Sequence, residues 1–437
     1  MVTTRPSIVG ASRRTRTQDR PEPVPSAPVR PAASGSGSSA PAPREAATAA
    51  GPTGAEVGGT RRAASRGDRM YALDALRFAA AIGVVLYHFI SRWHRGWGDA
   101  DPGLRFGDLA HVATYFALAP ELFFVVSGFV ILWTVWGRSV PQVVASRLSR
   151  IYPAYWTALA LTVFLLMVLW PTGKQISWAE VAVNVTLLQE AFGVRHVDGV
   201  YWTLWAELRF YLLIAVLVAI GVTRRRVLAF TLLWPAAALT ADLLGWGLLQ
   251  TLLISRYAPL FAGGMLLFLL YRDGHSRVPW LILGGNVVLA VHNIVPAQMR
   301  SLSRNTMFEP NPWLLGVLTV GCFATVGVVA LTRLRKISWA PLATLGALTY
   351  PLYLIHQFWG WWAIDRLDPR LPTYVVLAIA IILSVALAAF IHYGVEQRWT
   401  PVVRRGLEAR LTALGARLPR RTARPDAAVQ RPAAATA

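Results

Sequence analysis

The sequence predicts an all-α polytopic membrane protein with about ten transmembrane helices, and three observations lead to this fold class. Of its 437 residues, 55% are hydrophobic and only 15% are charged, whereas soluble globular chains carry roughly 25% charged residues. The mean hydropathy is +0.44. Apolar runs of about 20 residues, the length that crosses a hydrocarbon core as a helix, recur along the chain. These observations exclude an ordinary soluble globular protein.

Composition divides the chain into three parts. Residues 1–68 consist mainly of Pro, Ala, Ser, Gly, Thr and Arg without an apolar run, so they bury too little surface to offset ordering entropy, and we predict a disordered cytoplasmic tail. Residues 69–399 hold all the apolar runs and form the predicted membrane domain. Residues 400–437 are basic and predicted to be mostly disordered. The first run starts near Tyr71 without a following small-residue cleavage site, so we expect it to be retained.

Ten runs have the length and composition of spanning helices. They lie near residues 72–90, 114–137, 152–171, 202–222, 227–245, 252–271, 279–295, 313–332, 342–363 and 373–395. The run at 178–192 is amphipathic and carries Glu180 and Glu190, so we predict an interfacial or re-entrant helix there.

Basic residues concentrate in alternate loops, which orients the predicted helices. The basic loops carry Arg61, Arg62, Arg66, Arg69, Arg138, Arg147, Arg150, Arg224 to Arg226, Arg272, Arg277, Arg333, Arg335 and Lys336. By the positive-inside rule both termini are cytoplasmic, in a multi-pass protein of the plasma (inner) membrane.

The formal charge of +21 does not indicate a nucleic-acid partner, because about half of the excess lies in the two tails. Arginine beside apolar spans is typical of topology selection and attraction to anionic lipids, so membrane lipids are the expected partners. Cys322 is the single cysteine, which excludes an intramolecular disulfide and a Cys/His zinc cluster. We expect no metal.

The first span contains three ionisable residues, each costly at membrane depth unless paired or facing a cavity. Asp74, Arg77 and His88 share one helical face, with His88 roughly 16 Å above Arg77. This spacing fits a functional site. It also fits an interfacial ion pair of Asp74 with Arg77 and a histidine satisfied within the bundle.

Three later segments add polar residues at membrane depth. Ser127 and Gly128 lie mid-span, where small residues suit either close helix packing or a narrow ligand channel. Arg147 and Arg150 are i,i+3 neighbours that suit phosphate binding, although the positive-inside rule also predicts arginine there. The remaining candidates are Glu207 and Tyr211 in the fourth span and Tyr350, Tyr353 and His356 in the ninth.

In order and spacing these strings resemble acyltransferase family 3, integral membrane proteins that O-acylate bacterial surface glycans, peptidoglycan and some secreted metabolites. The resemblance covers residues 70–398. It rests on Arg77-x10-His88, Phe123-Phe124-x-x-Ser127-Gly128-Phe129, Arg147-x-x-Arg150, Trp202-Thr203-Leu204 with Glu207, Phe210 and Tyr211, and Tyr350 to His356. The chain departs from the family pattern at Thr349-Tyr350-Pro351 and after Glu396, which puts local helix geometry in question there.

The resemblance implies acyl-CoA, most simply acetyl-CoA, as a cytoplasmic co-substrate. Arg77, Arg147 and Arg150 would hold its phosphates, and its pantetheine arm would pass Ser127 and Gly128. His88 would act as general base or carry the acyl group covalently, oriented by Glu207. Asp74 is included among the catalytic candidates, and Tyr211, Tyr353 and His356 among those supporting the site or substrate.

The acceptor is expected to be a glycan or a hydroxylated metabolite, and the sequence indicates no particular protein partner. A transporter or flippase that uses Asp74, Arg77, His88 and Glu207 as a proton or substrate path is the alternative. The absence of a repeat between the two halves of the chain favours the enzyme.

Overall fold

The computed structural model describes residues 69–98 and 101–417, and this part of the chain is helical without a strand. The tail predicted at 1–68 and the end of the chain from 418 lie outside the described residues. The α-helices are α1 (Tyr71–Leu86), α2 (Pro102–Phe106), α3 (Asp108–Thr114), α4 (Ala119–Val135), α5 (Val140–Phe164), α6 (Trp178–Val185), α7 (Trp202–Ile220), α8 (Arg224–Leu243), α9 (Gly247–Leu252), α10 (Ala258–Asp273), α11 (Arg277–Asn305), α12 (Pro312–Leu331), α13 (Ala340–Leu367), α14 (Thr373–Ile391) and α15 (Gln397–Arg417).

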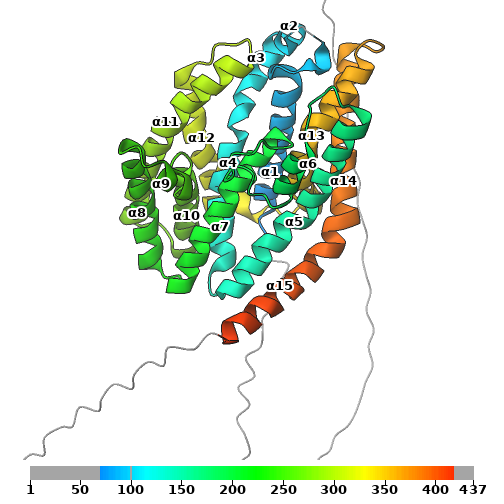
Figure 1. Ribbon diagram of the computed structural model, residues 1–437. Coiled ribbons are helices and arrows are strands. Elements are labelled where there is room, and N and C mark those ends of the chain that lie inside the picture. The colour runs from blue at the N-terminus through cyan, green and yellow to red at the C-terminus, as the bar shows by residue number, and fades with distance from the viewer. Residues whose placement is uncertain (1–68, 99–100, 418–437) are drawn as a thin grey trace, which may run out of the picture. The chain divides into compact units, whose positions relative to one another are not determined.

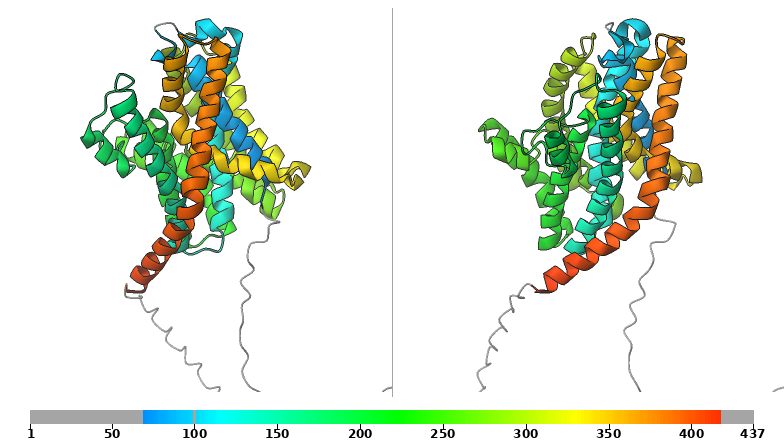
Figure 2. Two further views of the ribbon diagram at one scale, coloured as in Figure 1. Left: turned by 90° about the vertical axis from the view of Figure 1, so that its right-hand side faces the viewer. Right: turned by 45° about the vertical axis from the view of Figure 1, so that its right-hand side comes forward.

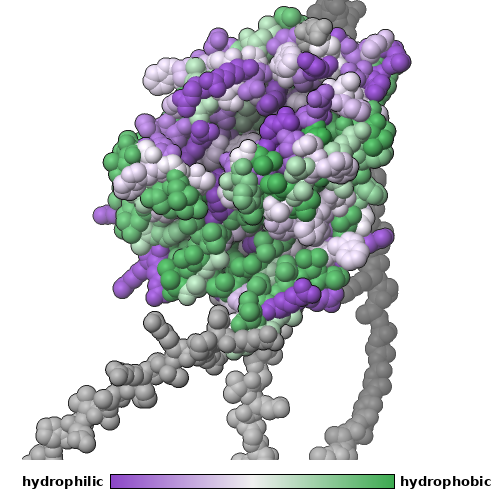
Figure 3. All heavy atoms as spheres, in the orientation of Figure 1, coloured by the Kyte–Doolittle hydropathy of each residue, from purple (hydrophilic) through white to green (hydrophobic). Residues whose placement is uncertain are grey.

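Within residues 69–98 and 101–417, eight helical segments are long and apolar enough to cross a membrane. They are Tyr71–Ser91, Asp108–Val135, Val140–Leu169, Gly199–Ile220, Arg224–Leu243, Arg277–Asn305, Pro312–Leu331 and Thr373–Ala416. On the face seen in Figure 3, hydrophobic residues fill the middle and lower part, and hydrophilic residues gather at the upper end and along α15. This is the distribution expected of a membrane protein.

Two of the ten predicted spans, α10 and α13, are helices that are not among these eight, because α10 is shorter and α13 is less apolar. Helix α10 has 16 residues, but it starts beside Asp242 at the end of α8 and ends in an ion pair of Asp273 with Arg224 at the start of α8. It therefore runs alongside α8 from one end to the other. Helix α13 is less apolar because it carries buried polar residues, among them Thr349, His356 and Gln357. That both helices cross the membrane, giving ten spans, remains a prediction.

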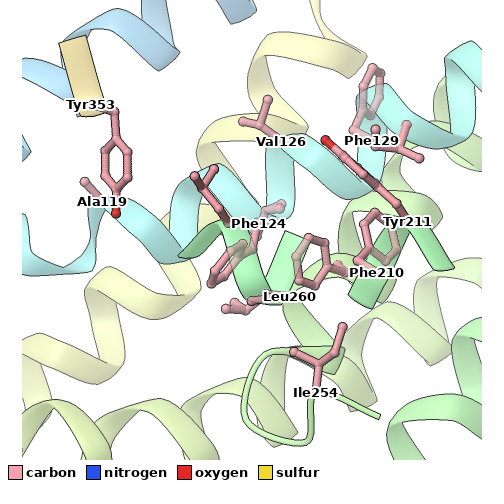
Figure 4. Packing of buried hydrophobic residues seen from close by; sticks show 14 of the residues in the cluster. Ala119, Phe124, Val126, Phe129, Phe210, Tyr211, Ile254, Leu260 and Tyr353 are labelled. Carbon is pink, nitrogen blue, oxygen red and sulfur yellow. The ribbon is translucent and has the colours of Figure 1, made fainter. Parts of the chain in front are cut away.

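Helix α10 packs in the centre of its half of the bundle, where every residue from Ala258 to Leu270 is buried. It crosses α4 at two glycines. A Cβ at Gly128 would lie 2.1 Å from the Phe261 carbonyl oxygen, and one at Gly264 would lie 2.0 Å from that of Val125. Only glycine permits this approach. Phe124, Phe210 and Leu260, from α4, α7 and α10, belong to the surrounding apolar layer (Figure 4).

The C-terminal region differs from the prediction. Helix α14 continues through a π-helical turn, His392–Glu396, into α15, which reaches Arg417 and leads across the lower end of the bundle (Figure 1, Figure 2). Residues 400–417, predicted as part of a mostly disordered tail, are therefore helical. The physical reason is tertiary: α15 packs along α5, which stabilises a segment that its own charge-rich composition does not mark as ordered.

Two helices, α5 and α6, have other boundaries than the sequence predicted. Helix α5 begins at Val140, well before the predicted span, with a capping box of Ser139 and Gln142, so Arg147 and Arg150 lie within a long helix and not in a loop. The run predicted as an interfacial or re-entrant helix forms the short α6 and then turns, with Leu187 at φ +65°.

Arg69 and Thr400 line the same cavity. The two ends of the described bundle therefore lie on one side. Which side of the membrane this is remains a prediction, namely the cytoplasmic one.

Candidate functional site

A large cavity opens between α1, α4, α5, α13 and the start of α15. We call it the basic cavity. It has a volume of about 800 Å³ and is lined by Arg69, Arg77, Arg138 and Arg150, against the two carboxylates of Asp74 and Glu396. Four guanidinium groups around one cavity suit a polyanionic ligand such as a phosphate ester.

Asp74 lies in this basic cavity, paired with Arg69 at 2.6 Å between Nε and Oδ2. It precedes His88 by fourteen residues along α1 and the helical turn that continues it, which corresponds to about 21 Å of rise. The structure thus places Asp74 with the arginines and far from His88. The ion pair that the sequence suggested between Asp74 and Arg77 is formed by Asp74 with Arg69.

Arg147 and Arg150 have different surroundings. Arg150 lines the basic cavity. Arg147 is buried, donates from Nη2 to Thr134 Oγ1 at 2.8 Å, and lies over the Tyr211 ring at 5.9 Å. The two arginines therefore do not line one pocket as a pair.

A narrow cavity of about 70 Å³ adjoins the basic cavity, and we call it the neck. The two share Arg77 and Tyr350 as lining residues. In the neck, Glu207 accepts hydrogen bonds from Tyr211 and, at 3.5 Å, from Ser127 Oγ. The hydroxyl end of Tyr211 points toward α4 (Figure 4). Ser127 lines the neck, whereas Gly128 is at the α4–α10 crossing.

Tyr353 closes the far end of the neck. Its hydroxyl accepts from Thr203 Oγ1 and donates to the Val200 carbonyl oxygen, both at 3.1 Å, and its side chain extends toward α4 beside Ala119 (Figure 4). Tyr353 and Pro120 also line the next cavity, which has about 240 Å³ and contains His88. We call it the His88 cavity. The basic cavity, the neck and the His88 cavity thus lie in series from one end of α1 to the other.

His88 lies in a π-helical turn, Tyr87–Ser91, which continues α1. Turns of this kind are frequent at functional sites. The imidazole is buried, its Nδ1 has no hydrogen-bond partner among the described residues, and the ring meets that of His356 edge to face with centroids 5.1 Å apart. Trp361 Nε1 donates to the His88 carbonyl oxygen at 2.9 Å.

His356 has a defined tautomer when neutral. Its Nδ1 lies 3.1 Å and 2.9 Å from the carbonyl oxygens of Leu352 and Tyr353, which can only accept, so Nδ1 carries the proton. Its Nε2 is then a free acceptor, and it has no partner among the described residues. Sequence reasoning named His356 but did not pair it with His88.

His94 supports the turn from the adjoining loop. It accepts from the Gly96 N–H at 3.1 Å through Nδ1, lies 3.2 Å from the Phe89 carbonyl oxygen through Nε2, and stacks on Trp361. Burial lowers the pKa of His94 to about 3. The ring therefore stays neutral and holds the polypeptide that follows His88.

The sequence did not identify several residues that line the His88 cavity, namely Arg92, Gln298, Ser301 and Gln357. Gln357 could have been found, because an amide beside His356 in an apolar span is unusual. Glu207 was expected to orient His88, but the structure places it in the neck.

No group of three His, Cys, Asp or Glu residues within 69–98 and 101–417 is arranged to hold a metal ion. That the protein needs no metal remains a prediction.

A family model described as an acyltransferase domain, that of acyltransferase family 3, matches residues 70–393. The chain belongs to acyltransferase family 3. The matched range contains most of the residues that line the three cavities, including His88, all residues of the neck and most arginines of the basic cavity. Neither a curated protein nor a solved structure matches the chain. Family membership and the eight apolar helices make this protein a multi-pass membrane acyltransferase.

Proposed function

We propose that the protein transfers an acyl group, most simply acetyl, from cytoplasmic acyl-CoA to a hydroxyl group of a glycan or hydroxylated metabolite on the opposite side of the plasma membrane. The observation that supports this most directly is the series of three cavities. It has arginines at one end, a narrow neck in the middle and, at the other end, a buried histidine whose Nδ1 has no hydrogen-bond partner among the described residues.

Acyl-CoA has two chemically different parts, and the cavities differ in the same way. Its nucleotide carries phosphates, which Arg77 and Arg150 would bind in the basic cavity together with Arg69 and Arg138. The pantetheine arm is thin and mostly neutral, and would pass the neck between Ser127 and Tyr350. The thioester would then reach the His88 cavity. Asp74 would hold Arg69 in place and take no part in the chemistry.

In the His88 cavity, we assign His88 as general base. The imidazole takes the proton of the acceptor hydroxyl as its oxygen attacks the thioester carbonyl carbon. The C–S bond breaks as the ester forms, and the imidazolium returns the proton to the departing thiolate. The net products are the ester and CoA thiol. His88 Nδ1 and His356 Nε2 make no hydrogen bond in the structure, but the two rings are in contact, so a rotation of His88 would let His356 Nε2 accept its Nδ1–H. This would leave His88 Nε2 unprotonated and available as the base.

The test uses cells with the chromosomal copy deleted and complemented with wild type or His88→Gln. Envelope glycans and secreted metabolites are compared by mass spectrometry. We expect one ester-linked acyl group that disappears on deletion and returns only with wild type. Return of the ester with His88→Gln at the wild-type level would overturn the assignment. Loss of a whole glycan or metabolite without any change in acyl mass would favour a transporter.

A further inference from the structure

A fourth cavity lies beside the His88 cavity, and the proposed function assigns it no role. We call it the polar cavity. It has a volume of about 520 Å³ and lies between α7, the connection from α8 to α10, and the C-terminal half of α11. Trp202 lines both this cavity and the His88 cavity, so the two are neighbours.

Three arginines, Arg209, Arg256 and Arg300, line the polar cavity. None of them forms an ion pair within 4.0 Å with another described residue. Arg209 is nevertheless held in place, because it donates from Nε to the Trp205 carbonyl oxygen at 3.2 Å and stacks on the Trp205 ring. Guanidinium groups that are fixed and lack a carboxylate partner are suited to bind an anion.

The turn that carries Arg256 is built with unusual backbone geometry. Ile254 has φ +56°, a conformation that is an outlier for a β-branched residue. Its side chain is buried, and hydrogen bonds from Trp234 Nε1 to the Leu253 carbonyl oxygen, 2.8 Å, and from Asn293 Nδ2 to that of Ser255, 3.1 Å, hold the turn on both sides. The turn is thus fixed in the position that brings Arg256 to the cavity.

The cavity also offers hydrogen-bond acceptors. Glu190 and Asp242 line it, and their carboxylates suit sugar hydroxyl groups, while Trp202 and Tyr257 provide aromatic surface. Exposed apolar residues, Leu244, Trp246 and Leu248, follow α8 beside the cavity. This apolar surface would suit the lipid part of a lipid-linked ligand.

We propose that the polar cavity binds the acceptor, and that the acceptor is an anionic, hydroxyl-bearing carbohydrate. Its carboxylate or phosphate contacts Arg209, Arg256 and Arg300, while one of its hydroxyl groups passes Trp202 into the His88 cavity. The role of the ligand as acceptor rests on the proposed function. Its binding to the cavity does not.

Binding is tested on the purified full chain with two oligosaccharides of equal length, tetragalacturonate and maltotetraose, by isothermal titration calorimetry. We expect the Kd for tetragalacturonate to rise about tenfold or more in Arg256→Gln/Arg300→Gln. The matched control is Arg225→Gln/Arg277→Gln, which removes two exposed arginines at the other end of α8 and α11 and is expected to bind like wild type. Equal affinity for the two oligosaccharides, or no effect of Arg256→Gln/Arg300→Gln, would overturn the proposal.

The source of the anionic group is tested separately. Membranes are incubated with radiolabelled acetyl-CoA, and the labelled product is partitioned between butanol and water and passed over an anion exchanger. Retention on the exchanger is expected, with the label in butanol for a lipid-linked acceptor and in water for a soluble one. A labelled product that is neutral would refute the proposal while leaving the acyltransferase function intact. Absence of any labelled product would refute the proposed function, whereas the binding result would still stand.

Discussion

The imidazole rings of His88 and His356 meet edge to face with their centroids 5.1 Å apart, although 267 positions separate them in the chain. Each ring has one buried nitrogen without a hydrogen-bond partner among the described residues, Nδ1 of His88 and Nε2 of His356. Buried polar atoms are normally paired. We interpret the two histidines as a unit in which His356 positions His88 for proton transfer.

Replacing His356 tests this unit. His356→Leu removes the acceptor that we propose for His88 Nδ1–H. We expect kcat for acyl transfer to fall about 10- to 100-fold, by analogy with the loss of groups that orient metal-ligating histidines. His356→Gln retains an acceptor oxygen and should keep more activity than His356→Leu. Because His356 does not bind the donor, the KM for acyl-CoA should not change. Equal losses in both variants would indicate a purely structural role.

Replacing Arg150 tests the basic cavity. Arg150→Gln removes one guanidinium group from the cavity wall, and a charge-assisted hydrogen bond to a phosphate contributes about 1.5–3 kcal/mol. We expect the KM for acyl-CoA to rise about tenfold with a small change in kcat. Arg410→Gln, at an exposed position of α15, is the control. If both variants behave like wild type, the phosphates of the donor are not held at Arg150.

The α4–α10 crossing predicts a contrast between two glycines. Gly128→Ala places a methyl group where it would lie 2.1 Å from the Phe261 carbonyl oxygen, so the helices must separate, at a cost of about 1–3 kcal/mol. Gly321→Ala in α12 meets no atom within 4 Å and should stabilise its helix by about 0.5–1 kcal/mol. Thermal unfolding in detergent should show a lower midpoint for Gly128→Ala and an unchanged or higher one for Gly321→Ala. A lowered midpoint in both would contradict the contrast.

Asp198 predicts a pH dependence of stability. Burial raises its pKa to about 7 from 3.8, more than Lys174 and Arg92 lower it. Because the folded chain keeps a proton that the unfolded chain releases above pH 4, stability falls between about pH 4 and pH 7 and stays lower above that.

Asp198→Asn cannot titrate, so between pH 5 and pH 8 its unfolding midpoint should fall less than that of wild type. The low pKa of His94 affects both proteins and cancels in the comparison. An equal dependence on pH in the two proteins would show that Asp198 is ionised in the folded state.

The sequence alone predicted the helical class and the placement of most helices, because apolar length is a local property. It also placed Arg77 and His88 correctly on the first span, since their spacing along one helix fixes their separation. The same reasoning failed where a partner lay outside the helix. Asp74 pairs with Arg69, which comes just before α1, so helical spacing does not predict the contact.

The relative heights of different helices could not be predicted. Glu207 was expected beside His88, but α7 is positioned so that Glu207 meets Ser127 in the neck. This position follows from packing between α4, α7 and α10, including the Phe210–Phe261 contact with ring centroids 4.2 Å apart. No local pattern in α7 encodes that register. The polar cavity was missed for the same reason, since its arginines come from separate segments.

The proposed function requires the pantetheine arm of the donor to pass through the neck and reach the acceptor in the His88 cavity. Blocking the neck therefore tests it directly. Leu204 lines the neck and is buried, and Leu204→Trp would fill this narrow space. In the purified full chain reconstituted in nanodiscs, the measurement compares binding of acetyl-CoA with transfer of its labelled acetyl group. We expect Leu204→Trp to retain binding of the CoA nucleotide, because the basic cavity is unchanged, and to lose acyl transfer. Transfer at the wild-type rate with the neck filled would contradict the proposed function.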